Sequence, residues 1–107
     1  MNEFQLCPRF EEAMKIISQR WTGLIFYEMM HSGPQRFSEI EASLPISGRV
    51  LSERLKDLEQ AGIIRREVFP ETPVRIEYSL TEKGQALKPV LKSIEVWSYN
   101  WITIDEK

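Results

Sequence analysis

The chain has 107 residues, which is the size of one domain with a modest core. Hydrophobic residues make up 42% of it and charged residues 28%, as in an ordinary globular protein. Its net charge is −2, whereas domains that bind nucleic acid are usually basic, so charge alone argues mildly against that partner. A single cysteine excludes an internal disulfide framework and a zinc cluster of several thiols. We therefore expect one domain over residues 1–107.

No apolar run approaches the length of a membrane span. The N-terminus also lacks the cationic region followed by an apolar block that marks a secretory signal. We expect a cytoplasmic protein with no membrane partner.

Two helices are predicted first. Residues 8–18 suit a helix because Pro8 favours the first helical position, where no N–H is needed. Its apolar residues recur at helical spacing and are expected to form a buried stripe: Phe10, Ala13, Met14 and Ile17. Residues 21–31 (WTGLIFYEMMH) are apolar nearly all round, as in a central core helix, and Gly33 with Pro34 ends them.

A short helix over residues 38–44 follows. Ser38 can cap it, and Glu41 lies at the spacing of a capping box. Residues 35–37 precede it and are expected to form a short strand that pairs with a later hairpin. Pro45 and Ile46 then form a turn.

The next helix, within SGRVLSERLKDLEQAGIIRRE, is the clearest element. Ser47 can cap its start, and Gly62 can take the left-handed conformation that ends it. One face is apolar: Val50, Leu51, Leu55, Leu58 and Ala61. The opposite face is polar: Arg49, Ser52, Glu53, Lys56 and Gln60. Arg, Ser and Lys facing outward near a helix start are typical of a DNA recognition helix, although a merely solvated face has the same pattern.

A β-hairpin is predicted after this helix. Residues 64–70 and 74–80 flank Glu71, Thr72 and Pro73, and the second segment alternates apolar and polar residues as a half-buried strand does. The order helix, turn, helix and hairpin predicts a winged helix-turn-helix, an α+β fold that is mainly α, with its DNA-binding core over residues 36–81.

A long last helix is expected over residues 82–104, with Thr81 as its cap and a kink or break near Pro89. Its apolar stripe, rich in tryptophan, suits a subunit interface. We expect the two terminal helices, 8–18 and 82–104, to form a homodimer. The interface residues would be Phe10, Met14, Ile94, Trp97 and Trp101. A monomer with a well-packed tail is the alternative.

The candidate DNA contacts come from three places: the short helix, the recognition helix and the hairpin. They are Arg36, Ser38, Ser47, Arg49, Ser52, Lys56 and Arg75. Arg75 would reach phosphate or the minor groove, which attracts arginine where it is narrow. Arg54 lies at the edge of the apolar face, so we expect it to bridge to Asp57 or Glu59 rather than to contact a base.

Enzymatic and metal sites are not indicated. His31 is the only histidine and has no cysteine near it, so a cation in the last helical turn is the better interpretation. A nucleophilic pair of Cys7 and His31 would need a third orienting group and a pocket, which the sequence does not suggest. We expect no catalytic residues, no metal and no cofactor.

Three stretches resemble the HxlR family of bacterial transcriptional regulators, relatives of MarR-type winged helices. They are CPRFEEAMKIISQRWTGLI, RFSEIEASLPISGRVLSERLKDLEQAGIIRRE and PETPVRIEYSLTEKGQALKPVLKSIEVW, which together cover nearly the whole chain. The resemblance implies a dimer that recognises an inverted repeat in double-stranded DNA. By it, the recognition helix starts at Ser47 and the wing tip surrounds residues 71–75.

Cys7 followed by Pro8 is similar to the branch of this family that senses quinones, diamide or other electrophiles through a thiol. The resemblance implies a regulator, expected to be a repressor, whose DNA binding is controlled by modification of Cys7. At the N-cap of a helix a thiolate is favoured by the helix dipole and Arg9, and opposed by Glu11 and Glu12. A buried structural cysteine, a regulator without thiol sensing, and a module that binds protein instead of DNA are the alternatives.

Overall fold

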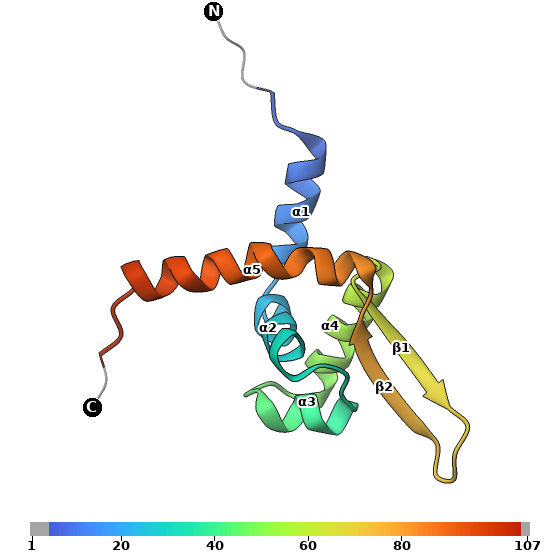
Figure 1. The fold of residues 1–107 in the computed structure, drawn as a ribbon. Helices are drawn as coiled ribbons and strands as arrows, with labels where there is room; N and C mark the ends of the chain where they lie inside the picture. Colours follow the sequence, from blue (N-terminus) through green and yellow to red (C-terminus); the bar gives the residue numbers. More distant parts are fainter. Residues whose placement is uncertain (1–4, 106–107) are drawn as a thin grey trace, which may run out of the picture.

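The structure is a computed structural model that describes residues 5–105. Five helices and one hairpin follow each other along the chain (Figure 1). They are α1 (Pro8–Ser18), α2 (Thr22–Ser32), α3 (Phe37–Ser43), α4 (Gly48–Gln60), β1 (Ile64–Phe69), β2 (Arg75–Leu80) and α5 (Glu82–Trp101). This order confirms the winged helix-turn-helix: α3 and α4 form the motif, and the hairpin that follows is its wing.

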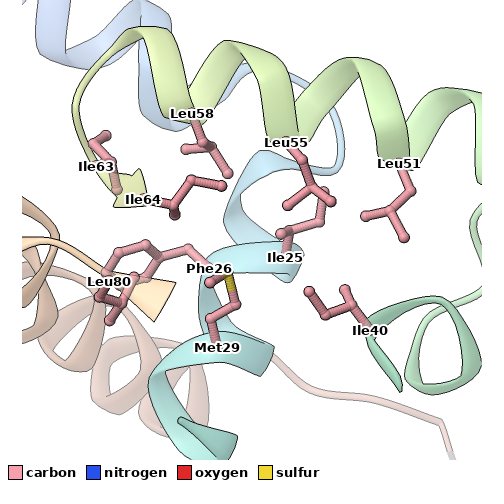
Figure 2. Close-up of a cluster of buried hydrophobic side chains, with 10 residues drawn as sticks. All are labelled: Ile25, Phe26, Met29, Ile40, Leu51, Leu55, Leu58, Ile63, Ile64 and Leu80. Carbon is pink, nitrogen blue, oxygen red and sulfur yellow. The ribbon is translucent and has the colours of Figure 1, made fainter. Parts of the chain in front are cut away.

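The core lies where α2, α3, α4 and the base of the wing meet (Figure 2). Its buried side chains are Ile25, Phe26 and Met29 of α2, Ile40 of α3, Leu51, Leu55 and Leu58 of α4, and Ile63, Ile64 and Leu80 beside the hairpin. The apolar face predicted for α4 supplies three of them at the spacing of one helical face. Burial of this face therefore fixes which side of α4 remains available at the surface.

Capping residues begin and end the helices where the sequence predicts. The Ser47 hydroxyl accepts a 3.2 Å hydrogen bond from the Val50 N–H, and the Thr81 hydroxyl accepts one of 3.1 Å from the Gly84 N–H. Gly62 follows α4 with a φ of +78°, the left-handed conformation that glycine adopts without a Cβ clash. Each of these signals is local, and each is confirmed.

The wing is an antiparallel pair whose register runs from Ile64 opposite Leu80 to Phe69 opposite Arg75. The segment before α3 pairs with β2 of this wing at one residue, Gln35. Gln35 exchanges two backbone hydrogen bonds with Tyr78, of 3.0 and 2.7 Å. The strand predicted over residues 35–37 is therefore reduced to a single bridge, because Arg36 already caps α3.

The start of α3 corrects one prediction. The helix begins at Phe37 with Arg36 as its N-cap, and Glu39 rather than Glu41 accepts the 2.8 Å hydrogen bond from the cap N–H. The Gln35 bridge brings the chain to the helix one residue earlier than the Ser38 signal suggests. Ser38 therefore lies inside the first turn, exposed.

Gly84 lets α5 pack closely on the chain that leads into β1. A Cβ on Gly84 would stand 2.3 Å from the carbonyl oxygen of Ile63 and 3.2 Å from Leu80 Cδ2. Real Cβ atoms do not approach that closely, so α5 can start in this position only with glycine there.

The helices at the two ends of the chain differ most from expectation. No residue of α1 is buried, so the stripe of Phe10, Ala13, Met14 and Ile17 is not buried within the chain. Figure 1 shows why: α1 projects away from the body, and only its last turn, where Ile16 packs against the core, reaches it. In α2, Leu24 and Tyr27 are exposed, so this helix is buried on one side and not all round.

In α5, only the first part of the apolar stripe meets the core. Leu87 and Leu91 pack against it, while Val90, Ile94, Trp97 and Trp101 are exposed. The helix runs through Pro89 without a break. Among residues 5–105, no helix is both long enough and apolar enough to cross a membrane.

Candidate functional site

The outward face of α4 carries the predicted recognition residues. Arg49 is 81% exposed, Lys56 is exposed, and Ser52 is half-buried. Arg49 Nη1 pairs with Glu53 Oε2 at 3.2 Å, one turn further along the helix. An ion pair between exposed groups contributes little and is easily exchanged for another partner. Arg49 and Lys56 therefore remain free to bind phosphate or a base edge.

Ser47 lies at the start of this face, but its hydroxyl oxygen already caps α4. It accepts the capping hydrogen bond from Val50, so it can still donate its own proton to an acceptor. Arg36 and Ser38 are exposed at the start of α3. These three residues and the two basic residues of α4 come from the two helices of one motif. Their contact with DNA stays a prediction.

Arg75 on the wing is held by two carboxylates and an aromatic ring. Its Nη2 lies 2.8 Å from Glu71 Oε2, its Nη1 pairs with Glu77, and its guanidinium carbon lies 3.9 Å from the centre of the Phe69 ring. The hydrogen bonds from Arg75 hold the pKa of Glu71 below its usual range and raise the pKa of Arg75. Arg75 can contact DNA only by sharing or leaving these partners.

Sequence reasoning missed this arrangement at the wing. The available signal was Glu71 four residues before Arg75 and Glu77 two residues after it, since residues two apart share one face of a strand.

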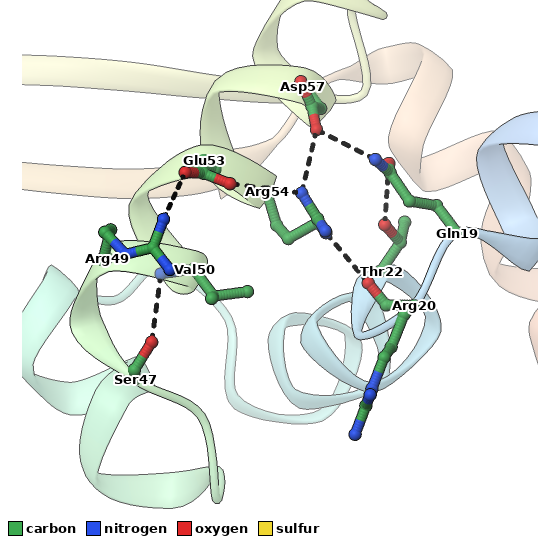
Figure 3. Close-up of polar contacts among 9 residues, drawn as sticks. All are labelled: Gln19, Arg20, Thr22, Ser47, Arg49, Val50, Glu53, Arg54 and Asp57. Atoms are coloured by element: carbon green, nitrogen blue, oxygen red, sulfur yellow. Dashed lines mark hydrogen bonds and ion pairs between the residues drawn. The ribbon is translucent and has the colours of Figure 1, made fainter.

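Arg54 points away from the outward face of α4. Its Nε donates a 3.0 Å hydrogen bond to the carbonyl oxygen of Arg20, and its Nη1 lies 3.5 Å from Asp57 Oδ2 (Figure 3). The prediction that Arg54 bridges to an acid rather than facing outward is confirmed for Asp57. Glu59, the other candidate acid, is exposed at the far end of the helix.

Cys7 is exposed and is the N-cap of α1. Its backbone carbonyl accepts the first helical hydrogen bond, 2.9 Å from the Glu11 N–H, and its side chain makes no capping bond. A thiol placed in this way is open to a reagent from solvent. Within the single chain, therefore, Cys7 is not a buried residue.

A cluster of polar side chains that sequence reasoning missed joins α2 to α5. Glu95 Oε2 accepts a 2.8 Å hydrogen bond from the Tyr27 hydroxyl and lies 3.8 Å from His31 Nε2, while Lys92 Nζ lies 3.3 Å from Glu95 Oε1. The bond from Tyr27 lowers the pKa of Glu95 and raises the pKa of Tyr27. His31, expected only as a cation in the last turn of its helix, thus also faces α5.

Beside this cluster lies an open hollow of about 530 Å³ between α2 and α5. Its lining is mostly apolar and comprises Trp21, Gly23, Leu24, Tyr27, Leu91, Ile94, Glu95, Ser98 and Tyr99. Within residues 5–105, no three His, Cys, Asp or Glu side chains gather as metal ligands.

The amino-acid sequence is similar to those of two HTH-type transcriptional regulators. It is 60% identical over 103 residues to the HTH-type transcriptional regulator YvaP of Bacillus subtilis, an overlap of 95% of this chain and 94% of YvaP. It is 48% identical over 94 residues to the HTH-type transcriptional regulator YodB of the same organism, 87% of this chain and 83% of YodB.

The fold matches solved structures of the transcriptional regulator YodB and of the redox regulator HypR. The reduced form of YodB superposes with a TM-score of 0.83 at 44% identity, covering 95% of this chain and all of that chain. The redox regulator HypR in its oxidized form superposes with a TM-score of 0.81 at 35% identity, covering 92% of this chain and all of HypR. YodB has also been solved after diamide treatment and with quinone bound.

The family model described as HxlR-like helix-turn-helix matches residues 16–106. Its members are transcriptional regulators and not enzymes, and the helix-turn-helix implies DNA as a partner. The motif of α3 and α4, the wing, the exposed basic residues of α4 and the match over most of the chain lead to one conclusion: this protein is a transcriptional regulator of the HxlR family.

Proposed function

We propose that this regulator is a homodimeric repressor that leaves its operator when an electrophile such as a quinone modifies Cys7. The observation that carries the proposal is an exposed thiol at the start of α1, a helix of which no residue is buried within the chain. A reactive group on a helix that packs against a second subunit can change how two subunits are arranged.

The dimer is supported by the apolar surface of the terminal helices. Phe10 and Met14 of α1 are exposed, as are Ile94, Trp97 and Trp101 of α5. Monomeric proteins rarely leave several large apolar side chains exposed along one helix, and aromatic residues are enriched at subunit interfaces. We propose that α1 and α5 cover these side chains with the same helices of a second copy.

Two subunits would place two copies of α4 in successive major grooves. Half-sites of an inverted repeat lie about one DNA turn, or roughly 34 Å, apart. The proposed contacts are Arg36, Ser38, Ser47, Arg49, Ser52, Lys56 and Arg75. A small change in the distance between the two α4 helices then removes one half-site from reach.

The chemistry at Cys7 needs no other residue. The thiolate sulfur adds to a ring carbon of the quinone and forms one C–S bond. The electron pair from sulfur reduces the quinone ring, which regains aromaticity as a hydroquinone. The displaced ring proton and one from solvent end on its two oxygens.

Diamide would act differently. Its N=N bond accepts the thiolate, and a second thiol then displaces the adduct, so a disulfide forms and diamide becomes a hydrazine. Because Cys7 is the only cysteine of the sequence, the second thiol must be Cys7 of the other subunit or a small thiol. The relatives YodB, solved with quinone and after diamide treatment, and HypR, solved oxidized, support a redox signal of this kind.

The test is DNA binding upstream of the protein's own gene, measured by mobility shift with wild type and Cys7→Ser in parallel. We expect quinone to release wild type and leave Cys7→Ser bound. Release of both proteins, or of neither, would reject thiol sensing and leave a regulator controlled by another signal. Reversal by reductant distinguishes a disulfide from alkylation. No specific shift at any salt concentration would favour a module that binds protein.

A further inference from the structure

Arg54 fastens the recognition helix α4 to the junction between α1 and α2 (Figure 3). Its Nε donates to the Arg20 carbonyl oxygen at 3.0 Å. The side chain is only 21% exposed, so most of this cation lies out of water. A cation in that position needs partners, because leaving it unpaired is costly. Arg54 is therefore held on the junction side of α4.

Asp57, one turn further along α4, forms a second link to the same junction. Its Oδ2 lies 3.5 Å from Arg54 Nη1 and accepts a 3.1 Å hydrogen bond from Gln19 Nε2. Gln19 Oε1 in turn accepts a 3.3 Å bond from the hydroxyl of Thr22, a buried residue that starts α2. Two residues of α4 are thus joined to the chain that runs from α1 into α2.

The junction has a defined conformation. Trp21 has a φ of +77°, a left-handed conformation that a bulky residue adopts only when its surroundings hold it there. The Thr22 N–H donates 3.1 Å to the Gln19 carbonyl, and the Ile25 N–H donates 2.9 Å to the Trp21 carbonyl. The turn therefore links α1 to α2 in one defined conformation.

The orientation of α1 depends on this junction. No residue of α1 is fully buried, Ile16 in its last turn packs against the core, and a hollow of about 380 Å³ lies between that turn and α4. Lys15, Ile16 and Ser18 line one side of the hollow, and Asp57 and Leu58 the other. A tilt of α1 about residues 19–21 would change the width of this hollow.

The same side chains lead to the outward face of α4. Arg54 Nη1 lies 3.8 Å from Glu53 Oε1, and the other oxygen of that carboxylate pairs with Arg49 at 3.2 Å. Arg49 is one of the proposed DNA contacts. Because exposed ion pairs are easily exchanged, a displacement at Arg20 would reach Arg49 mainly through Arg54 and the backbone of α4.

We propose that Arg54 and Asp57 are positioning residues that transmit a displacement of α1 to the recognition helix. The proposal rests on the proposed function, because modification of Cys7 at the start of α1 is the displacement considered. Coupling between sites is carried by packed or hydrogen-bonded groups that change together. These contacts form such a path between the reactive end of the chain and the DNA-binding surface.

The test compares the dissociation constant for operator DNA before and after quinone treatment. In wild type we expect the ratio of the two constants to be about 10 or more, within the usual range for allosteric coupling. Arg54→Met keeps the stem of the side chain and removes its charge and donors, and we expect its ratio to fall to about 3 or less. A merely structural role would weaken both constants equally and leave the ratio unchanged.

Arg20→Met is the matched control. It removes an exposed arginine, whose guanidinium carbon lies 5.1 Å from the centre of the Trp21 ring, but keeps the carbonyl oxygen to which Arg54 donates, so its ratio should equal that of wild type. Asp57→Asn is the second variant, and we expect its ratio to lie between those of wild type and Arg54→Met. If Arg54→Met does not fold, Asp57→Asn tests the proposal in its place.

The outcomes separate the two proposals. A wild-type ratio near 1 rejects thiol sensing and this inference with it. A large wild-type ratio that Arg54→Met and Asp57→Asn retain overturns the inference alone. Loss of the ratio in Arg20→Met as well would also overturn it, since charge at the junction, and not the Arg54 contacts, would then be responsible.

Discussion

The hydroxyl of Tyr27 in α2 donates a 2.8 Å hydrogen bond to the carboxylate of Glu95 in α5. This bond ties the helix at the centre of the DNA-binding body to the middle of the long terminal helix. The Glu95 side chain is 13% exposed and has His31 and Lys92 near its two oxygens. A carboxylate with so little access to water depends on these donors.

Removing the Tyr27 hydroxyl should destabilise the protein. In Tyr27→Phe, Glu95 loses its shortest hydrogen bond and regains little water, so we expect the thermal unfolding midpoint to fall by a few degrees. Circular dichroism on heating measures it. Tyr99→Phe is the control, because Tyr99 is 81% exposed. Equal midpoints for the two variants would show that the Tyr27 bond contributes nothing.

Acid should destabilise the protein partly through Glu28. Its carboxylate accepts hydrogen bonds from Gln35 Nε2 at 2.9 Å and Ser32 Oγ at 3.0 Å, and the bond from Gln35 is the main cause that lowers its pKa below the ordinary 4.5. Because the unfolded chain takes up the proton first as pH falls, this contribution is present at neutral pH. It is lost as the pH drops below 4.5 and through the lowered folded value.

Glu28→Gln isolates that contribution. The variant should be less stable than wild type at pH 7, and the difference should shrink towards pH 3, as measured by denaturant unfolding at several pH values. A difference that stays constant with pH would contradict the assignment.

Two glycines should respond in opposite ways to alanine. Gly84→Ala places a methyl group 2.3 Å from the Ile63 carbonyl oxygen, so we expect a loss of about 1–3 kcal/mol in the free energy of unfolding. Gly23→Ala in α2 meets no atom within 4 Å and should gain about 0.5–1 kcal/mol from helix propensity. Urea titration measures both. A harmless Gly84→Ala would mean that α5 can shift away from β1.

The proposed dimer should be sensitive to charge on α5. Ile94→Arg introduces a cation into the exposed apolar stripe, and we expect a monomer by sedimentation, with folding unchanged by circular dichroism. Val68→Arg is the matched control, because Val68 is 53% and Ile94 46% exposed, and Val68 lies on the wing. A dimer that survives Ile94→Arg would place the interface elsewhere.

Lys56 should contribute to the salt dependence of DNA binding. Each phosphate contact adds about 0.9 to the slope of log affinity against log salt, so Lys56→Met in a dimer should make the slope shallower by about 2. Fluorescence anisotropy between low and moderate salt measures it. Lys15→Met on α1 removes the same charge away from α4 and should keep the wild-type slope.

The elements that local chemistry determines could be predicted from the sequence. Ser47, Gly62 and Thr81 begin or end their helices as expected, because a cap needs only its own first or last turn. The buried face of α4 was also predictable from spacing. The start of α3 was not, because it depends on the bridge between Gln35 and Tyr78, a contact between residues far apart in the chain.

Partners of side chains were harder to predict than faces of helices. Periodicity predicts that Phe10 and Trp97 lie on apolar stripes, but it does not say whether the same chain or another one covers them. The site residues show the same limit. Arg49 and Lys56 are exposed as a recognition surface requires, while Arg75 is held by Glu71 and Glu77, which only the folded wing brings around it.

The contrast between the two ends of α5 has a mechanical consequence. The helix is held at its start, where Gly84 fits against Ile63, and again at Glu95, which accepts the hydrogen bond from Tyr27, while Trp97, Tyr99 and Trp101 beyond it are exposed. Its 20 residues make a rigid arm about 30 Å long. Because Leu91 and Glu95 hold the middle of α5 to the body of the subunit, a rotation at its exposed end would carry that body with it. In the proposed dimer, such a rotation would change the distance between the two α4 helices.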